Sequence, residues 1–204
     1  MVRKSVAVFA AAVVLASLAS TAHAQLGVYG TVTVGRLTGV QNSPVATPGV
    51  SYNSNVNPLG GTGGIYYDFK NYGPIRLGVD VRGTILTSKR GAEETSNGAG
   101  TRVDSGLGGV RASFHTPILG LKPYAEAMVG IGRSNYGIIL PTIASNGLKN
   151  NVEYHVFGGL DYKILPIMDW RAVELGYGGL EGGGHNYPLK SVSTGVVFHF
   201  PPPL

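Results

Sequence analysis

Cysteine is absent from the 204 residues, so disulfide bonds and thiolate metal sites are excluded. Beyond the first 24 residues there is also no uncharged apolar run of about 18 residues, so no helical membrane span is expected there. Charged residues make up only 13% of the chain, and its formal net charge is +5. This charge is small and evenly spread, so no nucleic-acid partner is expected.

The first 24 residues have the pattern of a secretory signal peptide. Two basic residues are followed by an uncharged apolar run over residues 6–19 and then by Ala22-His23-Ala24. Small residues at the first and third positions of that triplet are typical of a cleavage site. The apolar run of 14 residues is shorter than the roughly 20 that a membrane-spanning helix needs. We therefore expect export from the cytoplasm and a mature chain that begins at Gln25.

Glycine is unusually frequent, with 32 residues, and it has no three-residue period. Tyr, Val, Ile and Leu are interleaved with it, which excludes collagen and argues against a disordered linker. Each glycine inside a helix costs about 1 kcal/mol relative to alanine, whereas curved β-sheets tolerate glycine. The composition therefore favours an all-β fold.

Alternation of apolar and polar residues with a period of two predicts eight strands. The segments are 26–37, 63–72, 75–87, 102–116, 121–133, 152–164, 170–179 and 189–200. In the third segment Arg76, Asp80 and Arg82 all fall on one face, whereas a helix would spread them around its circumference. In the seventh segment Arg171 falls on the apolar side with Val173, while Trp170 falls on the polar side with Glu174. A β-bulge near residue 172 would turn Arg171 inward.

The connections between these segments alternate in length. The long ones span 38–62, 88–100, 135–151 and 180–188, and the short ones span 72–74, 117–120 and 165–169. Outer-membrane barrels have long extracellular loops at one end and short periplasmic turns at the other. The sequence therefore predicts an all-β, eight-stranded, antiparallel up-and-down transmembrane β-barrel over residues 25–200, with both termini in the periplasm.

A soluble lipocalin-like barrel is the competing fold, because it alternates in the same way. Its faces would be reversed, with apolar residues inside and charges outside. Alternation alone does not separate the two folds. The unequal loop lengths and the two terminal phenylalanines favour the membrane barrel.

The last segment resembles the C-terminal β-signal that the outer-membrane assembly machinery recognises. It carries Ser193, Gly195, Phe198 and Phe200 in the pattern polar, any, Gly, any, any, aromatic, any, aromatic. A last strand of this kind exposes a regular apolar face and an edge that can pair before the barrel closes. The Pro-rich tail 201–204 follows, and proline cannot extend the ladder, so we expect the strand to stop there.

Over residues 25–200 the organisation resembles the small outer-membrane β-barrel family, of which the membrane domain of outer membrane protein A is the familiar member. Residues 157–163 and 170–174 are similar to the penultimate hairpin of that family, with a Gly-Gly-x-Asp-Tyr strand followed by an Arg-Ala-x-Glu strand. The resemblance implies an integral outer-membrane location and assembly by the outer-membrane machinery. Because the sequence stops at 204, we expect no periplasmic peptidoglycan-binding domain.

The polar faces predict an inward set of charged residues. Its members are Asp68, Arg76, Asp80, Arg82, Arg111, Glu126, Glu153, Asp161, Arg171 and Glu174. A barrel of about eight strands is wide enough only for side chains to fill, and an unpaired buried charge costs several kcal/mol. We therefore expect a packed interior in which opposite charges pair. A narrow ion or solute channel lined by the same charges is the open alternative.

Catalytic and metal sites are only weakly indicated. Ser113 and His115 share one face of one segment and resemble part of a hydrolase dyad, but no acid partner is assigned. No cluster of His, Asp or Glu has the spacing of metal ligands, so we expect neither metal nor cofactor. The favoured role is structural or surface interaction, with the lipid bilayer and extracellular ligands as partners. A lipid-modifying enzyme is the less favoured alternative, and we expect no enzyme.

Replacement of Phe200 by Asp tests the β-signal interpretation. The carboxylate would interrupt the apolar face of the last strand, so we expect the F200D variant to fail to assemble. The measurement is the amount of protein in the outer-membrane fraction with heat-modifiable migration on gels. Normal insertion of the variant would count against the β-signal.

Overall fold

The computed structural model describes residues 25–38, 55–88, 102–114, 120–134, 149–182 and 185–200. The predicted signal peptide with Ala22 and Ala24, the tail 201–204, and most of the predicted loops 38–62, 88–100 and 135–151 lie outside the described residues. Within the described residues, no helix has the length and hydropathy needed to cross a membrane.

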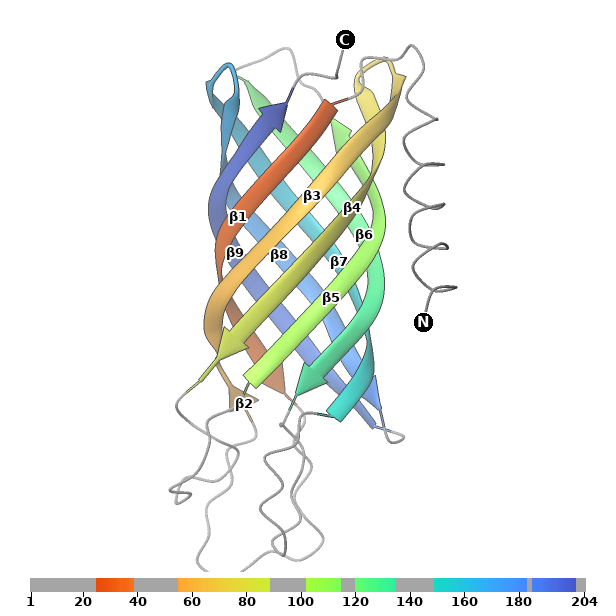
Figure 1. Ribbon diagram of the computed structural model, residues 1–204, viewed down its shortest axis with the longest axis vertical. Helices are drawn as coiled ribbons and strands as arrows, with labels where there is room; N and C mark the ends of the chain where they lie inside the picture. Colours follow the sequence, from red (N-terminus) through yellow and green to blue (C-terminus); the bar gives the residue numbers. More distant parts are fainter. Residues whose placement is uncertain are drawn as a thin grey trace, which may run out of the picture.

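The described elements form a closed antiparallel barrel (Figure 1). They are β1 (Gln25–Thr38), β2 (Asn55–Val56), β3 (Leu59–Tyr72), β4 (Ile75–Thr87), β5 (Arg102–Phe114), β6 (Leu121–Ser134), β7 (Lys149–Leu165), β8 (Met168–Gly182) and β9 (His185–Phe200). Each long strand pairs with the long strands before and after it, and β1 pairs with β9 to close the barrel. Among the described residues this gives eight long strands, so the predicted fold class is confirmed.

The start of β1 and the end of β9 lie at the same end of the barrel, at the top of Figure 1. We call this the terminal end, and the opposite end, where β2 lies, the loop end. Strands of 13 to 17 residues exceed the 9–11 residues that a tilted strand needs to cross a bilayer.

The predicted long connection 180–188 is wrong. Strands β8 and β9 remain paired out to Gly182 and His185. Leu180 and Leu189 point into the barrel and are buried, so both strands continue here around an apolar part of the interior. A polar-inside pattern does not continue through Leu180, so it ends β8 at residue 179 and begins β9 at residue 189.

The predicted connection 38–62 is wrong at its end, because it includes the glycine-rich start of β3. Residues 59–62 pair with both β1 and β4, so they belong to the sheet. Glycine supplies the same backbone hydrogen bonds as any other residue but no side chain, so the alternation of side chains cannot reveal such a strand.

The bulge predicted near residue 172 is confirmed. The register between β8 and β9 shifts between Arg171 and Glu174, and both of these side chains are buried inside the barrel. The same shift places Trp170 on the exterior, where it is exposed, so its predicted position on the polar side is wrong. A bulge reverses which face the preceding residues occupy.

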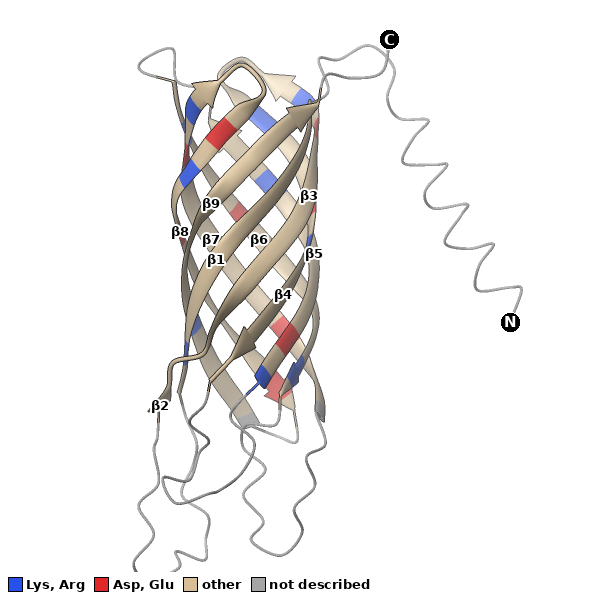
Figure 2. Cartoon of the chain, turned by 60° about the vertical axis from the view of Figure 1, so that its left-hand side comes forward, with Lys and Arg blue, Asp and Glu red and all other residues tan. Residues whose placement is uncertain are grey.

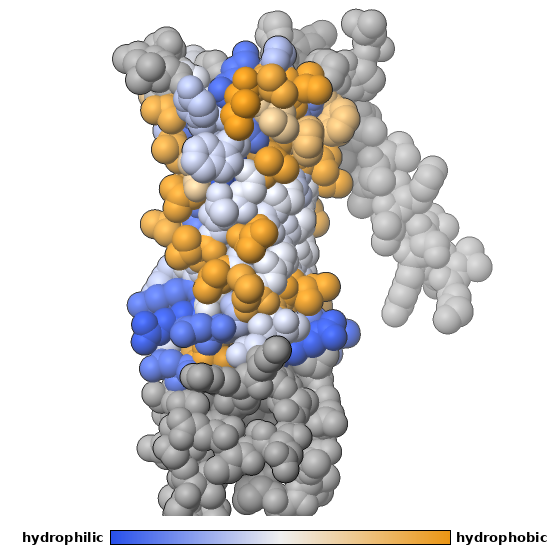
Figure 3. Space-filling view, turned by 90° about the vertical axis from the view of Figure 1, so that its left-hand side faces the viewer, coloured by the Kyte–Doolittle hydropathy of each residue, from blue (hydrophilic) through white to orange (hydrophobic). Residues whose placement is uncertain are grey.

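The outer surface is apolar and the interior is charged. Exposed apolar side chains occur on all eight long strands, for example Val34, Ile65, Val81 and Val110. Aromatic side chains gather near the terminal end, and these are Phe69, Tyr72, Phe114, Tyr162, Trp170, Phe198 and Phe200. Figure 3 shows hydrophobic residues along one face, with a hydrophilic band at the loop end of the described barrel. This arrangement is the reverse of a soluble barrel, which excludes the lipocalin-like alternative.

Each large aromatic ring in the middle of the interior lies directly across from a glycine on the next strand. The pairs are Tyr29 with Gly64, Tyr66 with Gly27, Tyr124 with Gly159, and Phe157 with Gly176. A Cβ atom on any of these glycines would come within 2.6 Å of the ring opposite. The glycines therefore leave the space in which the rings lie against the barrel wall.

Replacement of Gly64 by Ala tests this packing. The new methyl group would take the position of the Tyr29 ring, so we expect the free energy of unfolding to fall by about 1–3 kcal/mol. The neighbouring exterior residue Gly63 is the matched control, because a Cβ there meets nothing closer than 3.8 Å. Unfolding in urea should leave Gly63→Ala within about 0.5 kcal/mol of the wild type. Equal losses in the two variants would contradict the ring-on-glycine packing.

Candidate functional site

Three arginines and three carboxylates form a closed ring of ion pairs inside the barrel, which we call the charge ring. In order around the ring they are Arg82, Glu126, Arg111, Asp161, Arg171 and Glu174. They come from β4, β5, β6, β7 and β8, so the ring ties together strands that are distant in the sequence. Positive and negative groups alternate, and the ring as a whole is formally neutral.

Each carboxylate of the charge ring bridges two arginines. Glu126 contacts Arg82 and Arg111. Asp161 accepts from Arg171 Nε at 2.9 Å and lies 3.4 Å from Arg111 Nη2. Glu174 accepts from Arg82 Nη1 at 2.9 Å and from Arg171 Nη1 at 3.0 Å. Charge-assisted bonds of this kind are stronger than neutral ones.

Aromatic rings enclose the three guanidinium groups from the sides. Arg111 lies 4.2 Å from the centre of the Tyr66 ring and 4.0 Å from that of Tyr124. Arg171 lies 4.3 Å from the Tyr29 ring and 4.5 Å from the Tyr124 ring. Arg82 lies 4.1 Å from the Phe157 ring. Planar guanidinium groups stack favourably on aromatic faces, so the rings that lie on glycines also hold the cations.

The phenol groups connect the rings to the carboxylates. Tyr29 Oη donates to Asp80 Oδ1 at 2.9 Å, and Tyr124 Oη donates to Glu174 Oε2 at 2.6 Å. Asp80 also lies 3.5 Å from Arg82 Nε. All charged members of this assembly are at most 3% exposed. Their pairing offsets the cost of removing each charge from water.

Towards the loop end, the interior changes from charges to hydroxyl groups. Thr33 Oγ1 lies 2.9 Å from the hydroxyl oxygens of Thr62 and Ser193, and Ser105 donates to Glu153 at 2.5 Å. His155 Nδ1 lies 3.1 Å from Glu153. A cavity bordered by these groups has a volume of only about 20 Å³, which is room for a single water molecule.

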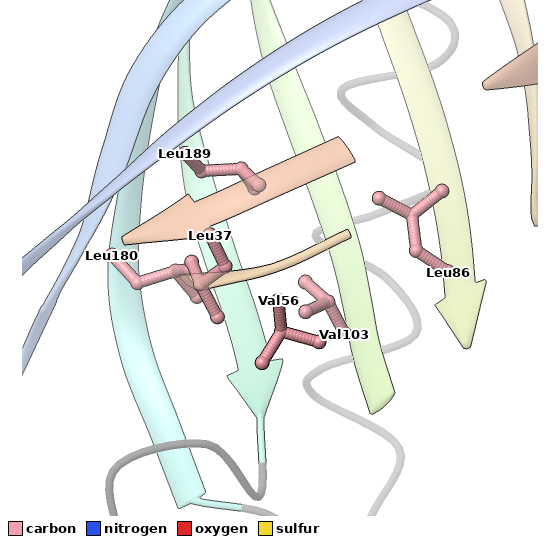
Figure 4. Packing of buried hydrophobic residues seen from close by; sticks show 6 residues of the cluster. All are labelled: Leu37, Val56, Leu86, Val103, Leu180 and Leu189. Atoms are coloured by element: carbon pink, nitrogen blue, oxygen red, sulfur yellow. The ribbon is translucent and has the colours of Figure 1, made fainter. Parts of the chain in front are cut away.

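Apolar side chains then close the loop end, and we call them the apolar cap. They are Leu37, Val56, Leu86, Val103, Leu180 and Leu189, all at most 3% exposed. Figure 4 shows them gathered across the barrel from strands on different sides. β2 contributes Val56 by pairing with the end of β1, and Gly35 N donates to the carbonyl of the buried Pro58 at 2.8 Å. The chain thus folds across the opening just before β3 begins.

A second polar cluster lies at the terminal end. Asp169 Oδ2 accepts from Lys122 Nζ and is paired with His199 Nε2, both at 2.6 Å. Tyr66 Oη lies 3.2 Å from His199 Nδ1. Beside this cluster, Arg76 Nη1 donates to Gln25 Oε1 at 2.7 Å, which attaches the start of β1 to β4. In Figure 2 charged positions lie at both ends of the barrel and on strands in its upper half.

The structure distributes the predicted inward charges over these layers. Arg82, Arg111, Glu126, Asp161, Arg171 and Glu174 meet in the charge ring. Asp80 adjoins the ring, Glu153 lies in the hydroxyl layer, and Asp68 is buried towards the terminal end. Arg76 is only partly buried.

The predicted site residues do not include Asp169, His199, the interior aromatic rings or the apolar cap. Alternation does place His199 and the three interior tyrosines on the polar faces. Asp169 stands at a strand end beside the bulge in β8, so alternation does not show which face it occupies. The leucines of the cap and Phe157 are apolar and do not match a polar-inside pattern. Residues an even number of positions apart on a strand face the same way, as Leu86 and Arg82 do. This spacing is the signal that could have placed Phe157 and the leucines inside the barrel.

The predicted β-signal residues lie on both faces of β9. Phe198 and Phe200 are exposed on the exterior, opposite Val28 and Leu26 of β1. Ser193 and Gly195 face inward, and Gly195 lies opposite Arg171. Ser113 is partly buried and lies opposite Arg76 and Tyr124, while His115 lies outside the described residues. Over the described ranges, no three His, Asp or Glu side chains are placed to hold a metal ion.

No protein-family model and no curated protein matches the sequence. Among solved structures, the barrel is similar to Neisserial surface protein A, with 15% identity, a TM-score of 0.57, and 86% of this chain and 97% of that chain covered. It is also similar to Ail, the attachment invasion locus protein of Yersinia pestis, with 14% identity, a TM-score of 0.52, and 88% and 100% covered. At this identity the likeness shows a shared fold, which confirms the resemblance to small outer-membrane barrels.

The chain is located in the bacterial outer membrane. Its exterior is apolar around the whole circumference, so lipid is the solvent that this surface requires. A closed barrel leaves no unpaired sheet edge in the bilayer, because β1 and β9 are paired over twelve positions. The fold is the one that solved outer-membrane barrels share.

Replacement of Arg171 by Met tests the charge ring. The variant leaves Asp161 and Glu174 short of one cation, so we expect a loss of about 3–5 kcal/mol in the free energy of unfolding. Adding Glu174→Gln makes the ring neutral again, and this double variant should be more stable than Arg171→Met alone. Exterior Arg133→Met is the control and should stay within about 0.5 kcal/mol of the wild type. A double variant less stable than the single one would contradict the ring.

Proposed function

We propose that the protein is a non-conducting outer-membrane barrel with a structural or surface-interaction role. The charge ring is the observation that carries the proposal. Its six side chains come from five strands and contact one another across the interior, so they occupy the path that an ion would need. Opening such a path would separate buried opposite charges, which is costly in a low-dielectric interior.

Two further layers support a closed interior. The apolar cap covers the loop end with aliphatic side chains, which ions do not cross readily. The cavity between the apolar cap and the charge ring has a volume of about 20 Å³, too small for a hydrated ion. A channel would need all three layers to move, and this argues against the conducting alternative.

The partners follow from the same architecture. The bilayer contacts the apolar exterior, and the exposed aromatic rings near the terminal end are suited to the membrane interface. We propose that the assembly machinery recognises β9 through Phe198 and Phe200, and that the terminal end faces the periplasm. The loop end would then face outward, and we propose that extracellular ligands are met at this end.

We also propose that the protein is not an enzyme. Ser113 lies opposite Arg76 and Tyr124 near the terminal end, so the candidate dyad would sit away from the outer leaflet. The histidines inside the barrel, His155 and His199, are nearly buried and paired with carboxylates. An altered lipid profile in cells that lack the gene would contradict this.

Planar-bilayer recording tests the closed interior. We expect no stepwise conductance, because the charge ring and the apolar cap both block the interior. Heat-modifiable migration of the same sample shows whether the barrel is folded, and a known porin shows whether the bilayer reports insertion. Reproducible conductance steps across several salts would overturn the proposal in favour of a narrow channel.

A further inference from the structure

Two basic side chains face each other on the outside of the barrel, across the seam between β1 and β9. Arg36 lies directly opposite Lys190, and both are exposed. Like charges directly opposite each other destabilise an antiparallel pair. Within the described strands neither residue forms an ion pair with a carboxylate. An external anion that binds between Arg36 and Lys190 would therefore reduce the repulsion between these two cations.

The next exterior position along this row is aromatic. Tyr177 of β8 lies opposite Lys190, and the Lys190 ammonium is 5.7 Å from the centre of the Tyr177 ring. Tyr177 is 63% exposed, so its ring and hydroxyl group face the surroundings. An exposed tyrosine beside a lysine, in one row with an arginine, is typical of the level where a bilayer changes from headgroups to acyl chains.

The next exterior row towards the middle of the barrel is wholly apolar. Val34, Val192 and Leu175 lie opposite one another two residues closer to the middle of the barrel, and they are 48%, 52% and 56% exposed. Two residues along a strand correspond to roughly 7 Å. In Figure 3 the hydrophilic band at the loop end borders hydrophobic residues in the same way. A ligand here would meet cations at one level and aliphatic side chains at the next.

We propose that Arg36 and Lys190 bind the phosphate group of an acylated, phosphorylated lipid in the outer leaflet. The guanidinium group offers a planar pair of donors to the phosphate oxygens, and the ammonium group adds a second positive charge. An acyl chain of the same lipid lies over Val34, Val192 and Leu175. This inference rests on the proposed function, because it requires the loop end to face outward from the outer membrane.

A second exterior group of basic residues shows the contrast. Arg133 of β6 lies opposite Asp104 of β5, and Arg102 Nε donates to the same carboxylate at 2.8 and 3.0 Å. This group already contains an acid between its two arginines. The pair across the seam contains none, so it is the stronger site for an anion and the other group is its natural control.

Lipid binding to the folded barrel in detergent micelles tests the site. The probe is diphosphoryl lipid A, an acylated disaccharide with two phosphates, and native mass spectrometry gives its Kd. We expect Arg36→Gln/Lys190→Gln to weaken binding about tenfold or more. Arg102→Gln/Arg133→Gln removes the same two charges at the same end and should weaken it by less than about threefold. Lipid A without phosphate should bind the wild type as weakly as the seam variant binds the intact lipid.

A stability measurement separates the site from a merely structural role. Without anionic lipid, the seam variant should unfold at a temperature equal to or above that of the wild type, because the repulsion is gone. At the same concentration of diphosphoryl lipid A, the wild type should be stabilised more than the seam variant. Equal affinity of the two double variants for the lipid would overturn the site while leaving the barrel proposal intact. Complete displacement of the lipid by a soluble sulfated oligosaccharide would overturn it in favour of a polysaccharide. A wild-type chain that fails to insert into membranes would instead overturn the proposed function.

Discussion

Six buried side chains that alternate in charge hold the middle of this barrel together. Removing any one of them leaves its two neighbours with one partner each in the ring and gives the buried ring a net charge, so the six positions depend on one another. The dependence extends outward through the aromatic rings, because Tyr29, Tyr66, Tyr124 and Phe157 pack against the guanidinium groups. It extends further to the glycines across from those rings, which leave the wall free for them. Glycine at these four positions is thus a consequence of filling a narrow interior with large side chains.

The interior is organised in layers that change chemistry along the barrel axis. A polar cluster around Asp169 lies at the terminal end, the charge ring follows, then hydroxyl groups, and the apolar cap closes the loop end. Opposite charges are paired within the charge ring and within the cluster around Asp169. On the outer surface, the surroundings change from acyl chains to headgroups along the same axis.

The seam between the first and last strands carries aromatic side chains at one end and basic side chains at the other. Phe198 and Phe200 lie on its exterior at the terminal end, and Arg36 and Lys190 lie on it at the loop end. β1 and β9 are the first and last strands of the chain, so their side chains are neighbours only in the closed barrel. The repulsion between Arg36 and Lys190 therefore appears only on closure, at the level where an anionic headgroup can offset it.

Alternation along the chain determined the number of long strands and most inward charges, because a period of two places each residue on one side of a sheet. The short connections indicated that successive strands run antiparallel. The partner of each charge was not determined, since residues such as Arg82 and Glu174 are 92 positions apart and meet only when the barrel closes. The apolar cap and the glycine-rich strand also required the tertiary structure, because neither matches a polar-inside pattern. The like-charged pair across the seam was equally hidden, because Arg36 and Lys190 become neighbours only through the register of β1 on β9.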